Sequence, residues 1–183
     1  MKRLLVVLIA LGLIAGCASS ANRRSLKDLP DYNFSVEIPD GWFKPKYEKR
    51  YLITKEEKAT LLYVFIQQRP LDRSFKNTQK KLSTRMLPLE SAGLILDELS
   101  SDRRIMNFEV LENTPAIIDG HAGFKILFTH KSKTGFQYKT LYYGFINGDS
   151  FYNIRYSAGI PDYYDKGIED FKQILGSFKL VEG

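Results

Sequence analysis

The chain has 183 residues, of which 44% are hydrophobic, 13% aromatic and 26% charged, and its formal net charge is +6. A disordered protein would lack this apolar content, so the composition excludes that class and favours one globular domain with appendages. Eleven Tyr and twelve Phe residues can supply a sizeable core, and the single cysteine excludes an internal disulfide.

The first sixteen residues have the pattern of an export signal. Lys2 and Arg3 are followed by thirteen uncharged residues, 4–16. As a helix this run would reach about 20 Å, less than the ~30 Å hydrocarbon core of a bilayer, so it predicts a cleaved signal peptide over residues 1–16. Without Lys2 and Arg3, 25 basic and 21 acidic residues remain. That mild excess does not indicate nucleic acid as a partner.

The end of this segment, Ile14-Ala15-Gly16-Cys17, resembles the lipobox of bacterial lipoprotein precursors. The resemblance implies that a lipoprotein signal peptidase recognises Ile14, Ala15 and Gly16 and cuts before Cys17. It also implies a diacylglycerol thioether on Cys17, and hence a membrane partner reached through this lipid anchor. Two buried acyl chains or more hold a protein firmly to a bilayer.

Two other interpretations stay open. An ordinary signal peptidase could cut near residues 19–21 and release a soluble protein, or the segment could remain as an uncleaved anchor with an inert cysteine. On the lipoprotein interpretation, position 18 is decisive for sorting: it is Ala18 and not the aspartate associated with inner-membrane retention. This implies an outer-membrane location facing the periplasm, if the host has an outer membrane. Residues 17–31 are expected to be the lipidated cysteine and a flexible tether spanning about 20 Å, and residues 32–183 a globular domain.

The first half of that domain predicts strands and then helices. Alternating Phe34, Val36 and Ile38 predict a strand that ends at residues 39–41, and residues 50–70 predict two strands joined by a charged turn at 55–58. Within this segment the continuously apolar run 61–66 is typical of a central strand. Helical spacing predicts a helix over 71–87, with Phe75, Gln79, Leu82 and Met86 on one face, and another helix after Pro88.

The second half predicts an antiparallel meander of four strands between Asn107 and Ala158. Its turns are marked by the pairs 119–120, 134–135 and 148–149, and its aromatic residues occupy both faces, so the sheet needs cover on both sides. A final helix is expected over 161–175, with Gly176 as its C-terminal cap, followed by a short strand over 177–181. Its predicted apolar stripe consists of Tyr164, Ile168, Phe171 and Leu175.

The order of these elements resembles the PsbP-like superfamily. The matching stretches are "FSVEIPDGW", "IDGHAGFK", "YKTLYYGFINGDSFYNIRYSA" and "FKQILGSFKL", which together span residues 32–181. That superfamily is named for an extrinsic subunit of photosystem II, and a nuclear-import cofactor that binds the GTPase Ran shares its fold. The resemblance implies an α+β fold, with an antiparallel sheet of about six to seven strands sandwiched by helices. Several bacterial members are lipoproteins with no assigned activity.

Catalytic and metal-binding signals are weak. His121 and His130, the two histidines, are nine residues apart on one predicted strand and should point to opposite faces. The sequence has no HExxH, paired-cysteine, GxSxG or phosphate-loop motif. The carboxylates near residues 162–170 are typical of a solvated helix face. We therefore expect no enzyme activity, no cofactor and no metal site.

One basic and aromatic cluster is a candidate binding surface. Such a surface could contact a polyanion, a headgroup or a protein partner; the alternative is a solvated loop with its tryptophan in the core. Its members are Trp42, Lys44, Lys46, Tyr47, Lys49 and Arg50.

The sequence therefore predicts an exported, lipid-anchored, non-enzymatic module at the cell envelope that binds or assembles an envelope protein. The alternative is a lipoprotein that binds a small ligand, a lipid or a metal ion.

Overall fold

A computed structural model describes residues 33–45, 51–55 and 61–181 of the chain. The signal peptide, Cys17 and the tether, together with Lys46, Tyr47, Lys49 and Arg50, lie outside these described residues. No helix in the described ranges combines the length and the apolar character needed to cross a bilayer.

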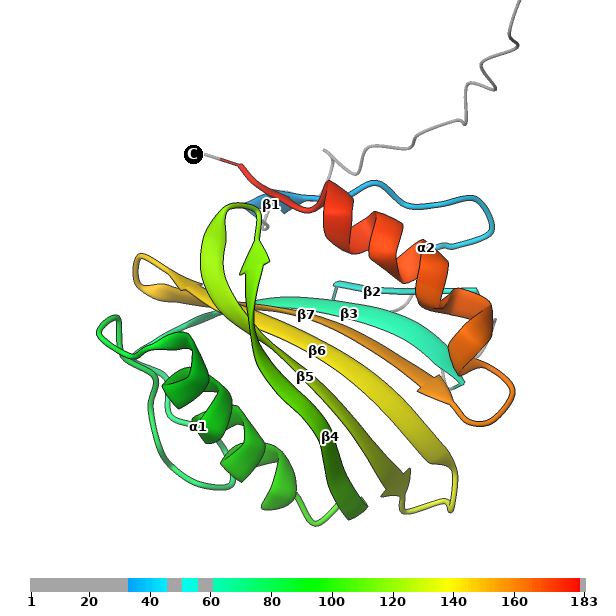
Figure 1. Cartoon of the computed structure of the whole chain (residues 1–183), viewed down its shortest axis with the longest axis horizontal. Coiled ribbons are helices and arrows are strands. Elements are labelled where there is room, and N and C mark those ends of the chain that lie inside the picture. The colour runs from blue at the N-terminus through cyan, green and yellow to red at the C-terminus, as the bar shows by residue number, and fades with distance from the viewer. Residues whose placement is uncertain (1–32, 46–50, 56–60, 182–183) are drawn as a thin grey trace, which may run out of the picture.

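The fold is α+β, with a six-stranded antiparallel sheet between two helices (Figure 1). The strand order is β2-β3-β7-β6-β5-β4, and a separate two-stranded sheet pairs β1 with β8. Both the fold class and the four-stranded meander, β4 to β7, are confirmed. The bounds are β1 Phe34–Ser35, β2 Tyr51–Thr54, β3 Leu62–Pro70, α1 Pro88–Ser100, β4 Ile105–Ile118, β5 His121–Ser132, β6 Gln137–Asn147, β7 Ser150–Gly159, α2 Tyr164–Ser177 and β8 Lys179–Leu180.

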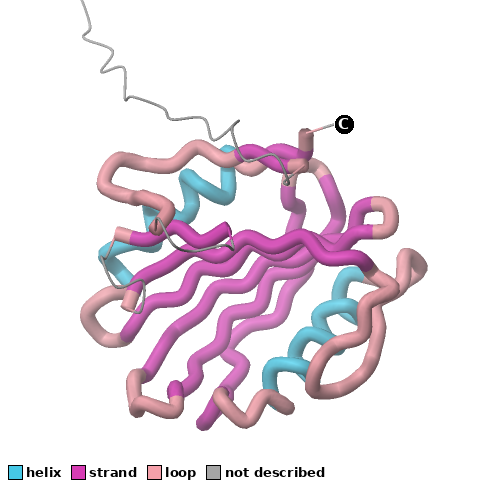
Figure 2. The backbone as a smooth tube through the Cα atoms, turned by 180° about the vertical axis from the view of Figure 1, so that it is seen from behind, coloured by secondary structure: helices cyan, strands magenta, loops and turns pink. Residues whose placement is uncertain are grey.

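The two helices lie on opposite faces of the sheet, and each covers a different core (Figure 2). Helix α2 packs on β7 and β3, whereas α1 packs on β4 and β5. Because successive side chains of a strand alternate between faces, Phe124, Ile126 and Phe128 of β5 are buried on the α1 face, while Leu127 packs on the α2 face. The aromatic residues on both faces therefore pack into two cores, as expected.

The hairpin turns of the meander lie where the sequence predicts them. Asp119, Gly120, Gly135 and Gly148 have φ angles of 47°, 77°, 87° and 55°. Such left-handed residues match the twist of tight hairpins. Strand β4 is the outer strand of the meander, and its pairing with β5 is interrupted by register shifts between Met106 and Glu109 and again just after Val110.

The predicted helix over 71–87 is wrong: this segment is a loop with turns, and helix α1 begins only at Pro88. Phe75 and Leu82 are nevertheless buried under the α1 face, so their apolar spacing reflects burial rather than a helix. Gln79 has a φ of 58°, which an α-helix does not allow. Tertiary contacts of this loop thus override its helical pattern.

The ends of the chain differ from expectation in smaller ways. Helix α2 passes through Gly176 and ends at Ser177; the next residue, Phe178, is extended, with a φ of −61° and a ψ of 129°, so the predicted glycine cap is wrong. Residues Phe34 and Val36 are buried as expected, but regular strand pairing is limited to Phe34–Ser35 and its partner β8.

Gly144 lies where the α1-side core leaves no room for a side chain. A Cβ placed there would lie 2.5 Å from Cζ of Phe124 and 2.8 Å from Cζ of Phe151, both of which are fully buried rings. Gly144→Ala should lower the free energy of unfolding by about 1–3 kcal/mol because the core must be overpacked. Urea denaturation of the purified protein measures this change.

The matched control is Gly93→Ala on α1, where an added Cβ would meet nothing within 4 Å. It should stabilise the protein by about 0.5–1 kcal/mol, because alanine favours a helix over glycine. Equal effects of the two substitutions would contradict this account of the core.

Candidate functional site

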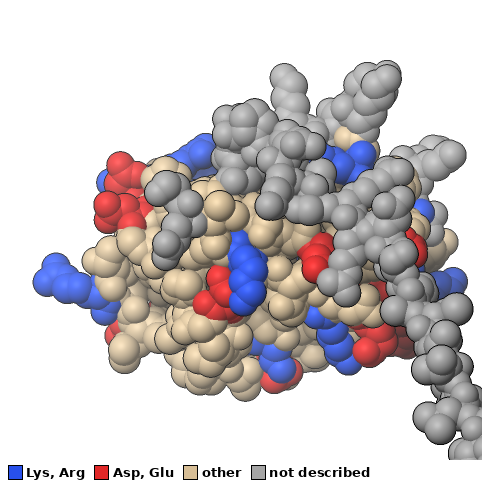
Figure 3. Space-filling view, turned by 90° about the horizontal axis from the view of Figure 1, so that it is seen from above, with Lys and Arg blue, Asp and Glu red and all other residues tan. Residues whose placement is uncertain are grey.

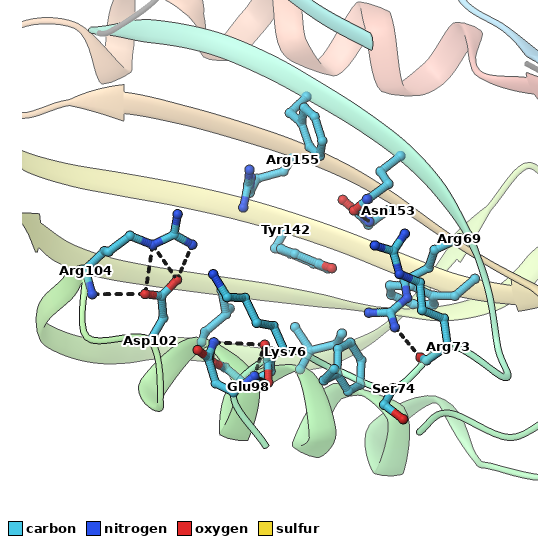
Figure 4. A pocket seen from close by; sticks show the side chains of 17 residues that line it. Arg69, Arg73, Ser74, Lys76, Glu98, Asp102, Arg104, Tyr142, Asn153 and Arg155 are labelled. Atoms are coloured by element: carbon cyan, nitrogen blue, oxygen red, sulfur yellow. Dashed lines mark hydrogen bonds and ion pairs between the residues drawn. The ribbon is translucent and has the colours of Figure 1, made fainter. Parts of the chain in front are cut away.

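A groove lies on the α1 face of the sheet, where α1 does not reach. Because α1 packs on β4 and β5, the same face of β3 and β7 is left open beside it. A cavity of about 380 Å³ lies here, between these strands, the loop after β3 and the C-terminal end of α1 (Figure 4). This size falls within the range of small-molecule sites.

Three cross-strand pairs form the floor of the groove. Strand pairing sets Phe65 opposite Arg155, Gln67 opposite Asn153, and Arg69 opposite Phe151. The Asn153 amide donates to Oε1 of Gln67 over 3.3 Å, and the Arg155 guanidinium lies 5.0 Å from the centre of the Phe65 ring. The period-two pattern of both strands thus places amides and arginines on a face that is otherwise apolar.

The wall of the groove is held by Glu98, near the end of α1. Its carboxylate accepts hydrogen bonds from the backbone amides of Asn77 (3.0 Å) and Thr78 (2.9 Å), and from the Thr78 hydroxyl (3.0 Å). Burial would raise the pKa of Glu98, but these hydrogen bonds outweigh it and lower the pKa. Glu98 therefore stays ionised and fixes the loop after β3 against the helix.

The second carboxylate of the groove, that of Asp102, is also hydrogen-bonded to a group of the protein itself. Asp102 accepts from Arg104 through Nε at 3.0 Å and through Nη2 at 2.6 Å. These hydrogen bonds, together with other contributions, lower the pKa of Asp102 to about 2. Asp102 is therefore a fixed anion rather than a proton donor.

Four cations of the groove have no carboxylate partner. Within the described ranges, no ion pair is formed by the side chains of Arg69, Arg73, Lys76 or Arg155. Arg69 donates to the backbone carbonyl of Arg73 and lies 4.2 Å from the centre of the Phe75 ring. Burial, and after it the nearby Arg73, lowers the pKa of Arg69. Nε of Arg155 is buried without a hydrogen-bond partner.

A neighbouring hollow of about 280 Å³ continues the groove towards His130 and shares Asp102, Arg104 and Arg155 with it. Burial, and then Arg155, lowers the pKa of His130, whose Nδ1 is buried without a hydrogen-bond partner. His121 lies on the other face, where its ring is tilted against that of Phe145 with 5.1 Å between the ring centres. The two histidines therefore do point to opposite faces, as expected.

The sequence-predicted binding surface is only partly described. Trp42 is 6% exposed and belongs to the α2-side core, as the solvated-loop alternative expects. Its Nε1 donates to Asp170 over 3.0 Å, and Lys55 pairs with the same carboxylate over 2.5 Å. Lys44 lies 5.8 Å from the centre of the Tyr51 ring. The surface as a whole stays a prediction because its other members lie outside the described residues.

Sequence reasoning missed the groove. A signal was available in the polar residues that alternate along two largely apolar strands, Gln67 and Arg69 in β3 and Asn153 and Arg155 in β7. Their shared period shows that they lie on one face of each strand. What the sequence could not show is that β3 and β7 are neighbours or that α1 lies elsewhere on this face.

His130 generates a prediction about pH. Because its pKa is lowered in the folded state, the unfolded chain binds more protons from about pH 6.5 downwards, and stability should fall as the pH is lowered from 7 to 5. His130→Phe should reduce this fall while preserving the ring stack on Tyr138. Urea midpoints of both proteins across this range measure it, with pH 8 as the common baseline. Equal pH slopes would contradict the proposed burial of a neutral imidazole.

The comparisons with known proteins concern the fold. No family model matches the sequence, and no curated protein matches it. Among solved structures, the chain is similar to cyanobacterial PsbP (CyanoP) from Synechocystis sp. PCC 6803, with 13% identity and a TM-score of 0.58 over 92% of this chain and 99% of that one.

Two further solved structures are similar. The Ran-binding protein Mog1p of Saccharomyces cerevisiae is 10% identical, with a TM-score of 0.55 over 89% of this chain and 97% of that one. LpqN, involved in cell envelope biogenesis of Mycobacterium tuberculosis, is 9% identical over 81% of this chain and 83% of that one, but its TM-score of 0.48 supports no conclusion about this chain. At these identities the similarity establishes architecture alone. The three-layered arrangement of one antiparallel sheet between α1 and α2 is thus the PsbP-like fold, which CyanoP and Mog1p share with this chain.

Proposed function

We propose that this chain is an exported lipoprotein, anchored through Cys17, that acts as a non-enzymatic binding module at the cell envelope. The observation that carries the binding role is the groove on the α1 face, in which four cations have no carboxylate partner among the described residues. The anchor rests on the lipobox-like residues 14–17 and on the apolar segment before them.

The chemistry of the groove supports binding rather than catalysis. Both carboxylates are bound to groups of the protein itself, Glu98 to the loop and Asp102 to Arg104. A general acid or base needs a proton to exchange near neutral pH, and the pKa of each of these carboxyls is lowered instead. The groove therefore presents fixed charges, which suit recognition.

The position of the first described residue supports an anchored module with an accessible groove. Asn33, the first described residue, donates to the Tyr152 hydroxyl over 2.7 Å and accepts from the backbone amide of Val181 over 2.9 Å, both on the α2 side. The part of that side visible in Figure 3 carries intermixed basic and acidic side chains. The groove opens on the opposite face of the sheet, so an anchor on the α2 side would leave it facing the aqueous compartment.

Cys17→Ser tests the anchor. In cells fed a radiolabelled fatty acid, the wild-type protein should take up label and the variant none, because the thioether needs the thiol. Ser19→Ala, two residues further on, is the matched control and should be labelled like the wild type. Label on Cys17→Ser, or none on the wild type, would overturn the lipoprotein proposal.

Crosslinking of the native protein in membranes tests the binding role. If one envelope protein is recovered with the wild type in an amount close to that of the wild-type protein itself, and is lost with Cys17→Ser, the chain is an assembly module. Recovery of no protein from either would favour the small-ligand alternative, in which the groove is the site.

The metal-ion form of that alternative has its own test. Among the described residues, no three His, Cys, Asp or Glu side chains are placed to hold a metal ion together. A chelator should therefore leave the melting temperature unchanged, because removing a bound ion is what would lower it. A fall of several degrees, reversed by one added divalent cation, would favour metal binding.

A further inference from the structure

We propose that the groove on the α1 face binds a small organic anion, one that carries a phosphate or carboxylate group on a ring or a short apolar body. The residues that would hold the anionic group are Arg69, Arg73, Lys76 and Arg155. This inference rests on the proposed function, because it takes the groove to be the binding site.

The charge of the groove is the first argument. Five cationic side chains line it, Arg104 in addition to the four above, against the two carboxylates of Glu98 and Asp102. Arg69 and Arg73 lie together at one end of the groove, and Arg104 and Asp102 at the other (Figure 4). Like charges repel, and after burial the neighbouring Arg73 contributes to the lowered pKa of Arg69. A bound anion would relieve this repulsion.

The type of cation is the second argument. A planar guanidinium binds phosphate or carboxylate through two parallel hydrogen bonds, and these charge-assisted bonds are among the strongest that proteins form. Arg69 and Arg155 are both placed against aromatic rings, Phe75 at 4.2 Å and Phe65 at 5.0 Å, which orients their guanidinium planes. The unpartnered, buried Nε of Arg155 is a donor that a ligand could satisfy.

The lining between the charged ends is apolar and aromatic. Phe65, Phe75 and Phe151 contribute rings, and Ile95 and Leu99 contribute the flank of α1. Tyr142 points its hydroxyl into the space between Arg69 and Asn153 (Figure 4). A bare inorganic ion would leave this surface uncovered, so the shape and lining favour an anion with an organic body.

The groove is held in shape before any ligand arrives. Glu98 ties down the loop that carries Arg73 and Lys76, and the Gln67–Asn153 hydrogen bond fixes the middle of the floor. Binding therefore needs little ordering of the protein, which favours affinity. The ligand we infer is a free anion, and the vesicle experiment below distinguishes it from a lipid headgroup.

Calorimetric titration of the full-length protein, purified in mild detergent, tests this inference with phenyl phosphate and pyrophosphate as probes and phenol as the neutral control. Wild-type protein should bind phenyl phosphate more tightly than pyrophosphate and should not bind phenol. Raising the salt concentration from about 50 mM to about 500 mM should weaken phenyl phosphate binding, because screening reduces the attraction between charges.

The deciding variant is Arg73→Gln with Lys76→Gln, since both side chains are exposed and the fold does not depend on them. It should lower the affinity for phenyl phosphate at least about tenfold, the loss expected when charge-assisted hydrogen bonds are removed. The matched control is Lys166→Gln with Lys172→Gln on α2, which removes the same charge from the opposite face and should bind like the wild type.

Co-sedimentation with phosphatidylglycerol vesicles, against phosphatidylcholine vesicles, separates the two sources of the anion. Binding only to phosphatidylglycerol vesicles, lost in the Arg73 and Lys76 variant, would identify a headgroup and keep the anion site. Binding of neither probe nor vesicle, or equal binding by the deciding variant and the wild type, would overturn the inference. An envelope protein crosslinked to the wild type in that case would leave the proposed function standing without this ligand.

Discussion

The antiparallel pairing of β3 with β7 is the constraint on which the rest of the molecule depends. Nine residue pairs join two segments 80 to 96 positions apart in the chain, and the resulting ladder carries the two-sided pattern of the sheet. Because side chains alternate with a period of two, a slip of one residue would turn Arg69 and Arg155 into the α2-side core and expose Val64 and Tyr156. The apolar core thus enforces the register that also builds the groove.

The two faces of the sheet are covered unequally, and this inequality creates the site. Helix α2 lies over β7 and β3 and completes a closed core, whereas α1 is displaced towards β4 and β5. The loop after β3 fills part of the remaining space with Phe75 and Leu82, and Glu98 secures it to α1. The part that stays open is the floor of the groove, with the amide pair Gln67–Asn153 and the arginines Arg69 and Arg155. A groove therefore follows from the offset of one helix rather than from a dedicated insertion.

The sequence predicted what depends on local pattern and missed what depends on tertiary contacts. Turn residues such as Gly135 and Gly148, the strands of the meander and helix α2 all follow from short-range signals. Residues 71–87 show the limit, because buried Phe75 and Leu82 have helical spacing within a loop that Glu98 holds from twenty residues away. The groove was missed for the same reason: Arg69 and Arg155 come to line one groove only because strand pairing places β3 beside β7.

Strand β4 has a further consequence for how this protein behaves among copies of itself. In the described part of the chain, this fourteen-residue strand ends the strand order on one side and has Ile117 72% exposed, so its outer edge is one on which a second sheet could grow. Its two register shifts and the proline at position 115, which lacks an amide hydrogen, interrupt the regular spacing that such growth requires. An irregular outer strand of this kind is a poor surface for edge-to-edge pairing, which in general limits the aggregation of sheet proteins.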